Sequence, residues 1–122
     1  MKRILSLILA LVLVIGMIPV QAHAATDSEG FVYEVYEDHV EITGYTGTAT
    51  EVVIPAQIDG LPTTSIGYEA FRDCENLISI SIPDCITKIG AFAFYGCKKL
   101  KSITIPDSVT RIGDWAFYDC ER

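Results

Sequence analysis

The amino-acid sequence predicts a mainly β solenoid, in which each coil contributes one short parallel strand and one short helical turn. Two observations predict it. At a lag of 23, residues 77–99 and 100–122 are identical at 13 of 23 aligned positions. Each copy alternates apolar and polar residues and then breaks at a proline, which is typical of a strand buried on one face. In such a repeat each coil covers the hydrophobic face of its neighbour.

The segment that ends at Ala24 has the three parts of a secretory signal peptide. Lys2 and Arg3 give a positive start, an apolar stretch covers Ile4–Ile18, and small residues stand at Ala22 and Ala24. As a helix, the apolar stretch would span about 22 Å, short of the roughly 30 Å hydrocarbon core of a bilayer. We therefore expect cleavage after Ala24 and a secreted or cell-surface protein. The membrane would be involved only through the cleaved signal peptide.

The charge balance excludes several classes of function. The chain of 122 residues has a formal charge of −7, and loss of Lys2 and Arg3 with the signal peptide makes it −9. Nucleic-acid binding needs clustered basic residues, so we expect no nucleic-acid partner. After Ala24 the chain holds one histidine, His39, and no methionine. We expect no catalysis, no cofactor and no metal, in a chain long enough for one small domain.

Residues 25–47 predict an N-terminal leader that covers the solenoid. Phe31–Tyr36 and Val40–Thr43 alternate in polarity on either side of Glu37–His39, which predicts a β-hairpin. An exposed strand edge invites pairing with other chains. We therefore expect this hairpin to cap the open N-terminal edge of the first coil.

Three copies of the repeat follow, at about residues 48–76, 77–99 and 100–122. The first copy is five residues longer, and its extra residues fall in Ala56–Pro62, where Gly and Pro predict a looped-out turn. Residues that recur at a lag of 23 should stack in one core. The predicted core residues are Ile54, Phe71, Cys74, Ile80, Ile82, Ile89, Phe94, Cys97, Ile103, Ile105, Ile112, Phe117 and Cys120.

The repeated motif Leu-x-x-Ile-x-Ile-Pro-x-x-Val-x-x-Ile-Gly-x-x-Ala-Phe-x-x-Cys resembles the BspA-like leucine-rich repeats of bacterial surface proteins. The resemblance covers about Thr48–Arg122. It implies a leucine-rich-repeat solenoid and adhesion to other proteins. Leucine-rich repeats generally carry Asn or Cys three residues after the last apolar strand residue. Here those positions hold Gln57, Cys85 and Ser108, so no asparagine ladder is expected.

The cysteines are better explained as core thiols than as disulfides. Cys74, Cys97 and Cys120 recur at a lag of 23 and so occupy equivalent places on successive coils. A strand spacing of about 4.8 Å exceeds the roughly 3.8 Å that separates Cβ atoms in a disulfide. Cys85 has no counterpart in the next copy, so we expect it to be the most exposed and reactive thiol. The cysteine spacing also disfavours zinc.

The outward face of the repeated strands is the candidate binding surface. Solenoids use such extended faces to bind other molecules. The face lacks the aromatic and Arg residues that dominate binding energy in most interfaces. Its residues are Glu51, Val53, Ser79, Ser81, Ser102 and Thr104.

The sequence stops where the next strand would start, so we expect a fragment of a longer array. The leading hypothesis is a secreted or cell-surface scaffold that binds extracellular or envelope proteins. One alternative makes the repeats the N-terminal accessory module of a longer exported enzyme. A second alternative is a structural spacer.

Overall fold

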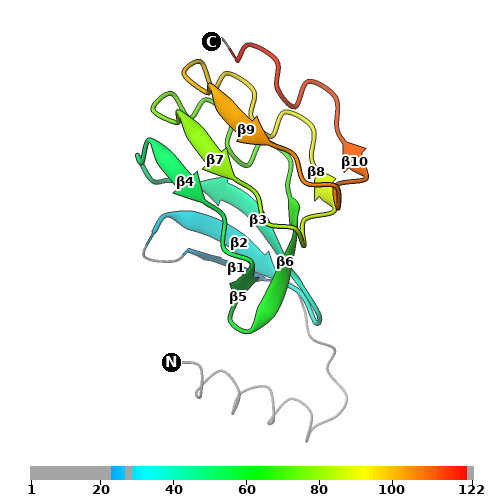
Figure 1. Ribbon diagram of the computed structural model, residues 1–122. Coiled ribbons are helices and arrows are strands. Elements are labelled where there is room, and N and C mark those ends of the chain that lie inside the picture. Colours follow the sequence, from blue (N-terminus) through cyan, green and yellow to red (C-terminus); the bar gives the residue numbers. More distant parts are fainter. Residues whose placement is uncertain (1–22, 27–28, 121–122) are drawn as a thin grey trace, which may run out of the picture.

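The computed structural model describes residues 23–26 and 29–120, which form two β-sheets wound into a solenoid (Figure 1). Residues 1–22 of the predicted signal peptide lie outside the described residues. Ala24, the expected last residue of that peptide, belongs to the first strand. The strands are β1 (His23–Thr26), β2 (Phe31–Val35), β3 (Val40–Tyr45), β4 (Glu51–Val53), β5 (Gln57–Ile58), β6 (Leu61–Ile66), β7 (Ser79–Ser81), β8 (Lys88–Ile89), β9 (Ser102–Thr104) and β10 (Arg111–Ile112).

Each coil contributes a strand to both sheets, where the sequence predicted one strand per coil, and the first coil also holds β5. The small sheet has the order β4-β7-β9, and the large sheet has the order β1-β2-β3-β6-β8-β10, with β5 paired to β6. The three coils therefore hold β4 and β6, β7 and β8, and β9 and β10. The second strand of each coil ends at the Ile of the Ile-Gly pair. In the second and third coils it covers only Lys88–Ile89 and Arg111–Ile112, too short for alternation to reveal it.

The register of the small sheet confirms the repeat period that the sequence predicted. Its strands are parallel, and Val52, Ile80 and Ile103 are aligned across β4, β7 and β9. In the large sheet Ile66 and Ile89 are aligned in the same way. Equivalent apolar side chains are thereby stacked between the two sheets.

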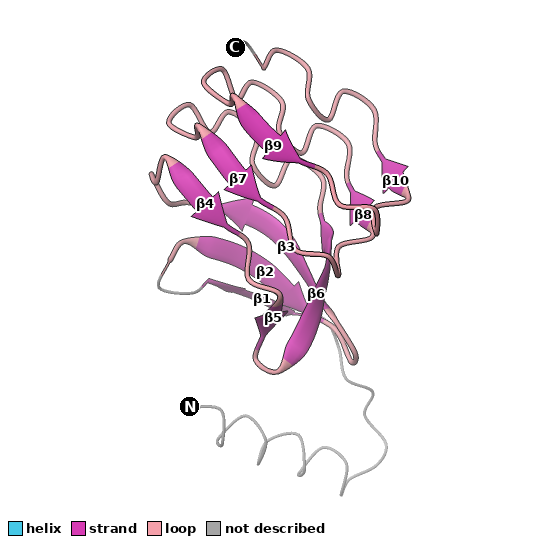
Figure 2. Cartoon of the chain, viewed as in Figure 1, coloured by secondary structure: helices cyan, strands magenta, loops and turns pink. Residues whose placement is uncertain are grey.

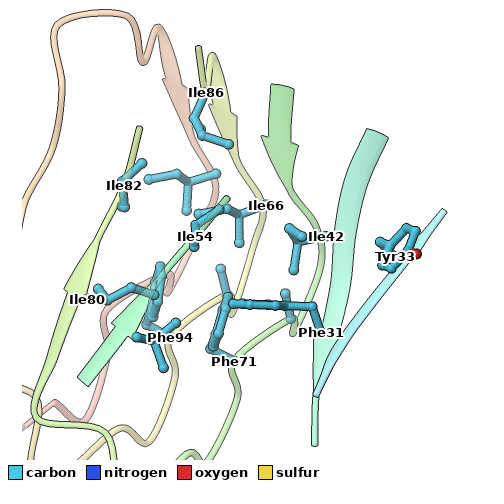
Figure 3. Close-up of a cluster of buried hydrophobic side chains, with 14 of the residues drawn as sticks. Phe31, Tyr33, Ile42, Ile54, Ile66, Phe71, Ile80, Ile82, Ile86 and Phe94 are labelled. Carbon is cyan, nitrogen blue, oxygen red and sulfur yellow. The ribbon is translucent and has the colours of Figure 1, made fainter. Parts of the chain in front are cut away.

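A column of aromatic rings fills the space behind the sheets. Phe71 and Phe94 are fully buried and stack with ring centroids 5.2 Å apart, and Phe117 continues the column at 5.3 Å (Figure 3 shows Phe71 and Phe94). At the N-terminal end Tyr45 packs on Phe71, and Phe31 packs on Tyr45, each at 5.4 Å. The leader thus supplies the two rings at the N-terminal end of the column.

The Ala-Phe-x-x-Cys segments form successive turns, and the prediction of helical turns was wrong. No helix occurs in the part of the chain that the structure describes (Figure 2). Six non-glycine residues have a positive φ, which a right-handed helix excludes. Five of them lie within these segments or immediately before their alanine, and they recur with the repeat, together with Gly96. They are Glu69, Phe92 and Trp115 at one position, and Asp73, Gly96 and Asp119 at the other.

Hydrogen bonds between coils explain this backbone path. The amide of Phe71 donates to the carbonyl of Ala93 at 2.7 Å, and the amide of Phe94 donates to Ala116 at 2.8 Å. Alternate amides of the first two segments reach the next coil in this way, while the intervening amides close turns within the segment. A helix would keep all these donors within one coil, so the stacking of coils determines the conformation.

The close approach of the coils requires glycine at the bend after the second strand. A Cβ added at Gly90 would lie 2.7 Å from the backbone carbon of Gly67 and from the nitrogen of Tyr68. Carbon and nitrogen atoms that are not bonded cannot approach so closely. The Ile-Gly motif therefore reflects backbone packing between consecutive coils.

The burial of the predicted core residues follows their place in the stack. The predicted core residues of the first two coils are buried, apart from the half-buried Cys74, whereas Ile103, Ile105, Phe117 and Cys120 of the third coil are partly buried and pack against the core. Ile112 is 47% exposed, which contradicts its assignment to the core. It lies on β10, which is paired on one side only, with β8.

The leader pairs directly with the solenoid. β2 and β3 form an antiparallel hairpin, β1 pairs with β2, and β3 pairs in parallel with β6. The large sheet thus extends beyond the first coil through β3, β2 and β1, and the capping role of the hairpin stays a prediction.

In the first coil, Asp59 and Gly60 both have a positive φ and join β5 to β6 as a tight turn within the expected insertion.

Candidate functional surfaces

The structure places the six residues of the predicted binding surface together on the small sheet. Glu51, Ser79 and Ser102 are aligned in one row, and Val53, Ser81 and Thr104 are aligned in a second row. Ser79 is half-buried, the other five are exposed, and Val53 is 69% exposed. We call these six residues the hydroxyl face. It is flat, regular and without an aromatic side chain.

A second surface, formed by the turn segments, carries large side chains that the sequence prediction missed. Phe92 stacks on Trp115 with ring planes 3° apart, and Tyr95 stacks on Tyr118 with centroids 5.6 Å apart. Tyr68 meets the edge of Phe92 at 5.8 Å. Tyr68, Trp115 and Tyr118 are all more than half exposed, at 63%, 54% and 53%. We call these five residues, together with Arg72, the aromatic surface.

Arg72 lies at the N-terminal end of the aromatic surface and is held there by charge and by ring contacts. Its guanidinium carbon lies 4.9 Å from the ring centre of Tyr95 and 5.8 Å from that of Phe92. It pairs with Glu69 and lies 3.6 Å from Asp73. The hydrogen bond to Glu69 raises the pKa of Arg72, with a smaller opposing effect of burial. One guanidinium face is thus occupied by aromatic rings, as in a cation–π contact.

The aromatic surface has the chemistry of a protein-binding site. Trp, Tyr and Arg are the residue types that contribute most to the free energy of binding at interfaces. Tyr hydroxyls and the Trp115 indole N–H can also donate hydrogen bonds to a partner. The sequence signal was present, because Phe92 and Tyr95, and Trp115 and Tyr118, flank the Ala-Phe pair of their copies. The prediction assigned only the buried side of that segment, formed by its Ala, Phe and Cys residues, and did not consider the opposite side.

All four cysteines are free thiols. Cys97 is fully buried and donates to the carbonyl of Phe71 at 3.0 Å. A hydrogen bond between the two thiols lowers the pKa of Cys74 and raises that of Cys97, and burial adds to the rise for Cys97. Cys85 is half-buried, with its sulfur 3.5 Å from the carbonyl oxygen of Ala56. Its predicted reactivity stays a prediction.

A charged row crosses the outer face of the large sheet. Glu41, Ser65, Lys88 and Arg111 are aligned across β3, β6, β8 and β10, and they line a hollow of about 260 Å³. Burial, followed by repulsion from Glu34, raises the pKa of Glu41, while Lys88 partly offsets the rise. In the described part of the chain no three His, Cys, Asp or Glu side chains gather as a metal site. No helix there is long and apolar enough to cross a membrane.

The comparisons with known proteins agree with this architecture. The T. pallidum leucine-rich repeat protein is 38% identical and superposes with a TM-score of 0.73 over 77% of this chain and 45% of its own. A leucine-rich cell surface protein from Faecalibacterium prausnitzii is 34% identical, with a TM-score of 0.71 over 82% of this chain and 29% of its own. This chain therefore spans less than half the length of either relative. Among curated proteins, none matches it.

The match to a protein family covers the whole solenoid. Residues 49–122 match the family described as a BspA type leucine-rich repeat region (6 copies). This range begins just before β4 and includes all three coils. The chain belongs to the BspA-type leucine-rich repeat family.

Proposed function

We propose that this protein is a secreted or cell-surface scaffold that binds extracellular or envelope proteins and catalyses no reaction. The aromatic surface is the observation that carries the proposal, because five aromatic side chains and Arg72 gather on one side of the coils, and three of the rings are more than half exposed. Singly exposed apolar residues are ordinary, whereas a contiguous patch indicates an interaction site. The F. prausnitzii relative is itself a cell surface protein, which supports the proposed location.

Substitutions on the hydroxyl face provide the matched control for substitutions on the aromatic surface in a binding measurement. The serine and threonine side chains of the hydroxyl face offer little area to bury, so their loss should change binding by less than about 1 kcal/mol. Removal of Trp115 and Tyr118 should weaken binding far more. If both faces contact the partner, the aromatic side chains should still contribute most of the free energy.

Biosensor titration against purified extracellular-matrix and envelope proteins tests the proposal. Trp115→Ala/Tyr118→Ala should weaken binding more than about tenfold, the effect of a moderate hot spot. Ser81→Ala/Thr104→Ala should bind like the unmodified chain. Because Trp115 is the only tryptophan, its fluorescence should also change when a partner covers it. Equal losses from both variants would move the site away from the aromatic surface, and the absence of any saturable partner would favour a spacer.

A further inference from the structure

The two sheets of the solenoid end at different heights, and this leaves one strand position empty. The large sheet continues past the first coil through β3, β2 and β1, whereas the small sheet ends at β4 (Figure 1). In the described residues nothing pairs with the free edge of β4. A coil placed before the first one would add one strand beside β6 and one strand beside β4. β3 occupies the place beside β6, whereas in the described residues no strand occupies the place beside β4.

The free edge of β4 carries unpaired backbone groups. The amide of Ser79 donates to the carbonyl of Thr50 at 3.1 Å, and the amide of Ile54 donates to the carbonyl of Ser81 at 3.0 Å. Since alternate residues of a strand direct their backbone groups to opposite sides, those of Glu51 and Val53 face away from β7. A strand edge of this kind is a template for another strand.

A groove beside this edge can receive side chains. It has a volume of about 470 Å³ and lies between β4 and the leader, where Phe31, Tyr45 and Val52 provide apolar walls. The side chains of Glu51 and Val53 are exposed on the edge strand itself. Added strands gain affinity from backbone hydrogen bonds and specificity from pockets for alternate side chains, and this edge offers both.

The charge of the leader determines which strand would fit. Between Ala25 and Gly60 the chain has eight acidic residues and no Lys or Arg. Glu29 and Glu51 lie in the groove itself. A strand with Lys or Arg at alternate positions would face these carboxylates, and the apolar side chains between them would enter the groove.

We propose that the free edge of β4 binds an extended, basic peptide segment of another protein as a fourth strand of the small sheet. The topology disfavours a second copy of this chain as the occupant. A docked coil would bring one strand to each sheet, and β3 already occupies that position in the large sheet. A single strand needs only the vacant position in the small sheet. This site is separate from the aromatic surface.

Fluorescence anisotropy with the full chain tests the proposal. The probe is a dye-labelled hexapeptide of alternating Lys and Val, compared with a copy that is N-methylated at alternate amides and with a Glu-Val hexapeptide. We expect saturable binding of the Lys-Val probe that weakens as salt rises. The N-methylated and Glu-Val peptides should each bind at least tenfold more weakly. Equal binding of either peptide would overturn the proposal, as would a lack of saturable binding.

Variants locate the binding on the molecule. Glu51→Lys should weaken the Lys-Val probe at least fivefold, whereas Glu37→Lys makes the same charge change in the β2–β3 turn and should have no effect. Amide shifts in an NMR titration should be largest at Glu51 and Val53. Equal effects of the two Lys variants, or shifts centred elsewhere, would overturn the site. Trp115→Ala/Tyr118→Ala should bind the probe normally. The proposal for the β4 edge and the proposal for the aromatic surface can therefore fail independently.

Discussion

Phe94 stacks face to face on Phe117, with ring centroids 5.3 Å apart and ring planes 4° apart. The two residues are separated by one repeat, so each ring occupies the same place on its own coil. Phe94 is fully buried between Phe71 and Phe117, whereas within the described residues Phe117 has a neighbour in the column on one side only. The energy of the column should therefore be unevenly distributed.

Phe94→Ala should lower the free energy of unfolding by about 3–5 kcal/mol, because it leaves a cavity in the middle of the column. Phe117→Ala removes the same atoms from a partly buried site and should cost clearly less. Urea unfolding followed by circular dichroism gives both values. Equal costs for the two variants would mean that the rings do not share a continuous core.

Gly90→Ala should destabilise the protein by about 2 kcal/mol or more, because the new Cβ meets backbone atoms of Gly67 and Tyr68, which cannot move aside without separating the coils. Gly44→Ala is the control. There the added Cβ would lie 3.3 Å from the side chain of Val32, within a strand. The control should change the free energy of unfolding by less than about 1 kcal/mol. A tolerated Gly90→Ala would contradict the close approach of the coils.

Alkylation should distinguish Cys74 from Cys97 at neutral pH. The reactive species is the thiolate, and the hydrogen bond between the two thiols lowers the pKa of Cys74 and raises that of Cys97. Cys97 is also fully buried. Timed iodoacetamide labelling with mass spectrometry should modify Cys74 at least tenfold faster. In urea the rates should converge, and a difference that persists in urea would point to local sequence effects.

Export should remove the signal peptide, up to and including Ala24. Ala24→Trp should block processing and leave the signal peptide on the protein, because signal peptidase accepts only small side chains at that place. Ala25→Trp lies just after the expected cut and should be processed normally. Intact-mass analysis of the exported protein distinguishes the two. Cleavage of both variants at a different position would show that the predicted site is wrong.

Much of the solenoid could be predicted from the sequence because its signals repeat at one period. That period places Ile80 beside Ile103 and Phe94 beside Phe117, and the structure has both pairs. The turn segments were misassigned because a positive φ at Phe92 or Trp115 has no local sequence signal. Hydrogen bonds with neighbouring coils impose that conformation, and a single copy does not encode them.

The candidate surfaces divide in the same way. Alternation was enough to place Ser81 and Thr104 on one exposed face, because the side chains of a strand follow a period of two. Tyr95 and Tyr118 recur at the same lag as the core residues and stack in the same way. The aromatic surface was missed because only the buried positions of the turn segments were assigned from the motif. The vacant position beside β4 depends on how many strands the leader adds to one sheet and not to the other.

Glu41→Gln should stabilise the protein at neutral pH. Burial, followed by repulsion from Glu34, raises the pKa of Glu41 in the folded state, while Lys88 and His39 act in the opposite direction. A carboxyl group with a raised folded pKa favours folding while it is protonated. The advantage is present below its unfolded pKa and is lost as the pH rises through the folded pKa.

The Gln side chain copies the protonated shape, so the variant should exceed the unmodified chain in stability at pH 7 and match it near pH 3. Because Glu41 is only half-buried and solvent screens its charge, the gain should be below about 1 kcal/mol. Glu37→Gln, at an exposed position in the β2–β3 turn, is the control and should show no such difference. Urea unfolding at both pH values gives the comparison. A lower stability of Glu41→Gln at pH 7 would mean that the ionised carboxylate helps to hold the leader on the solenoid.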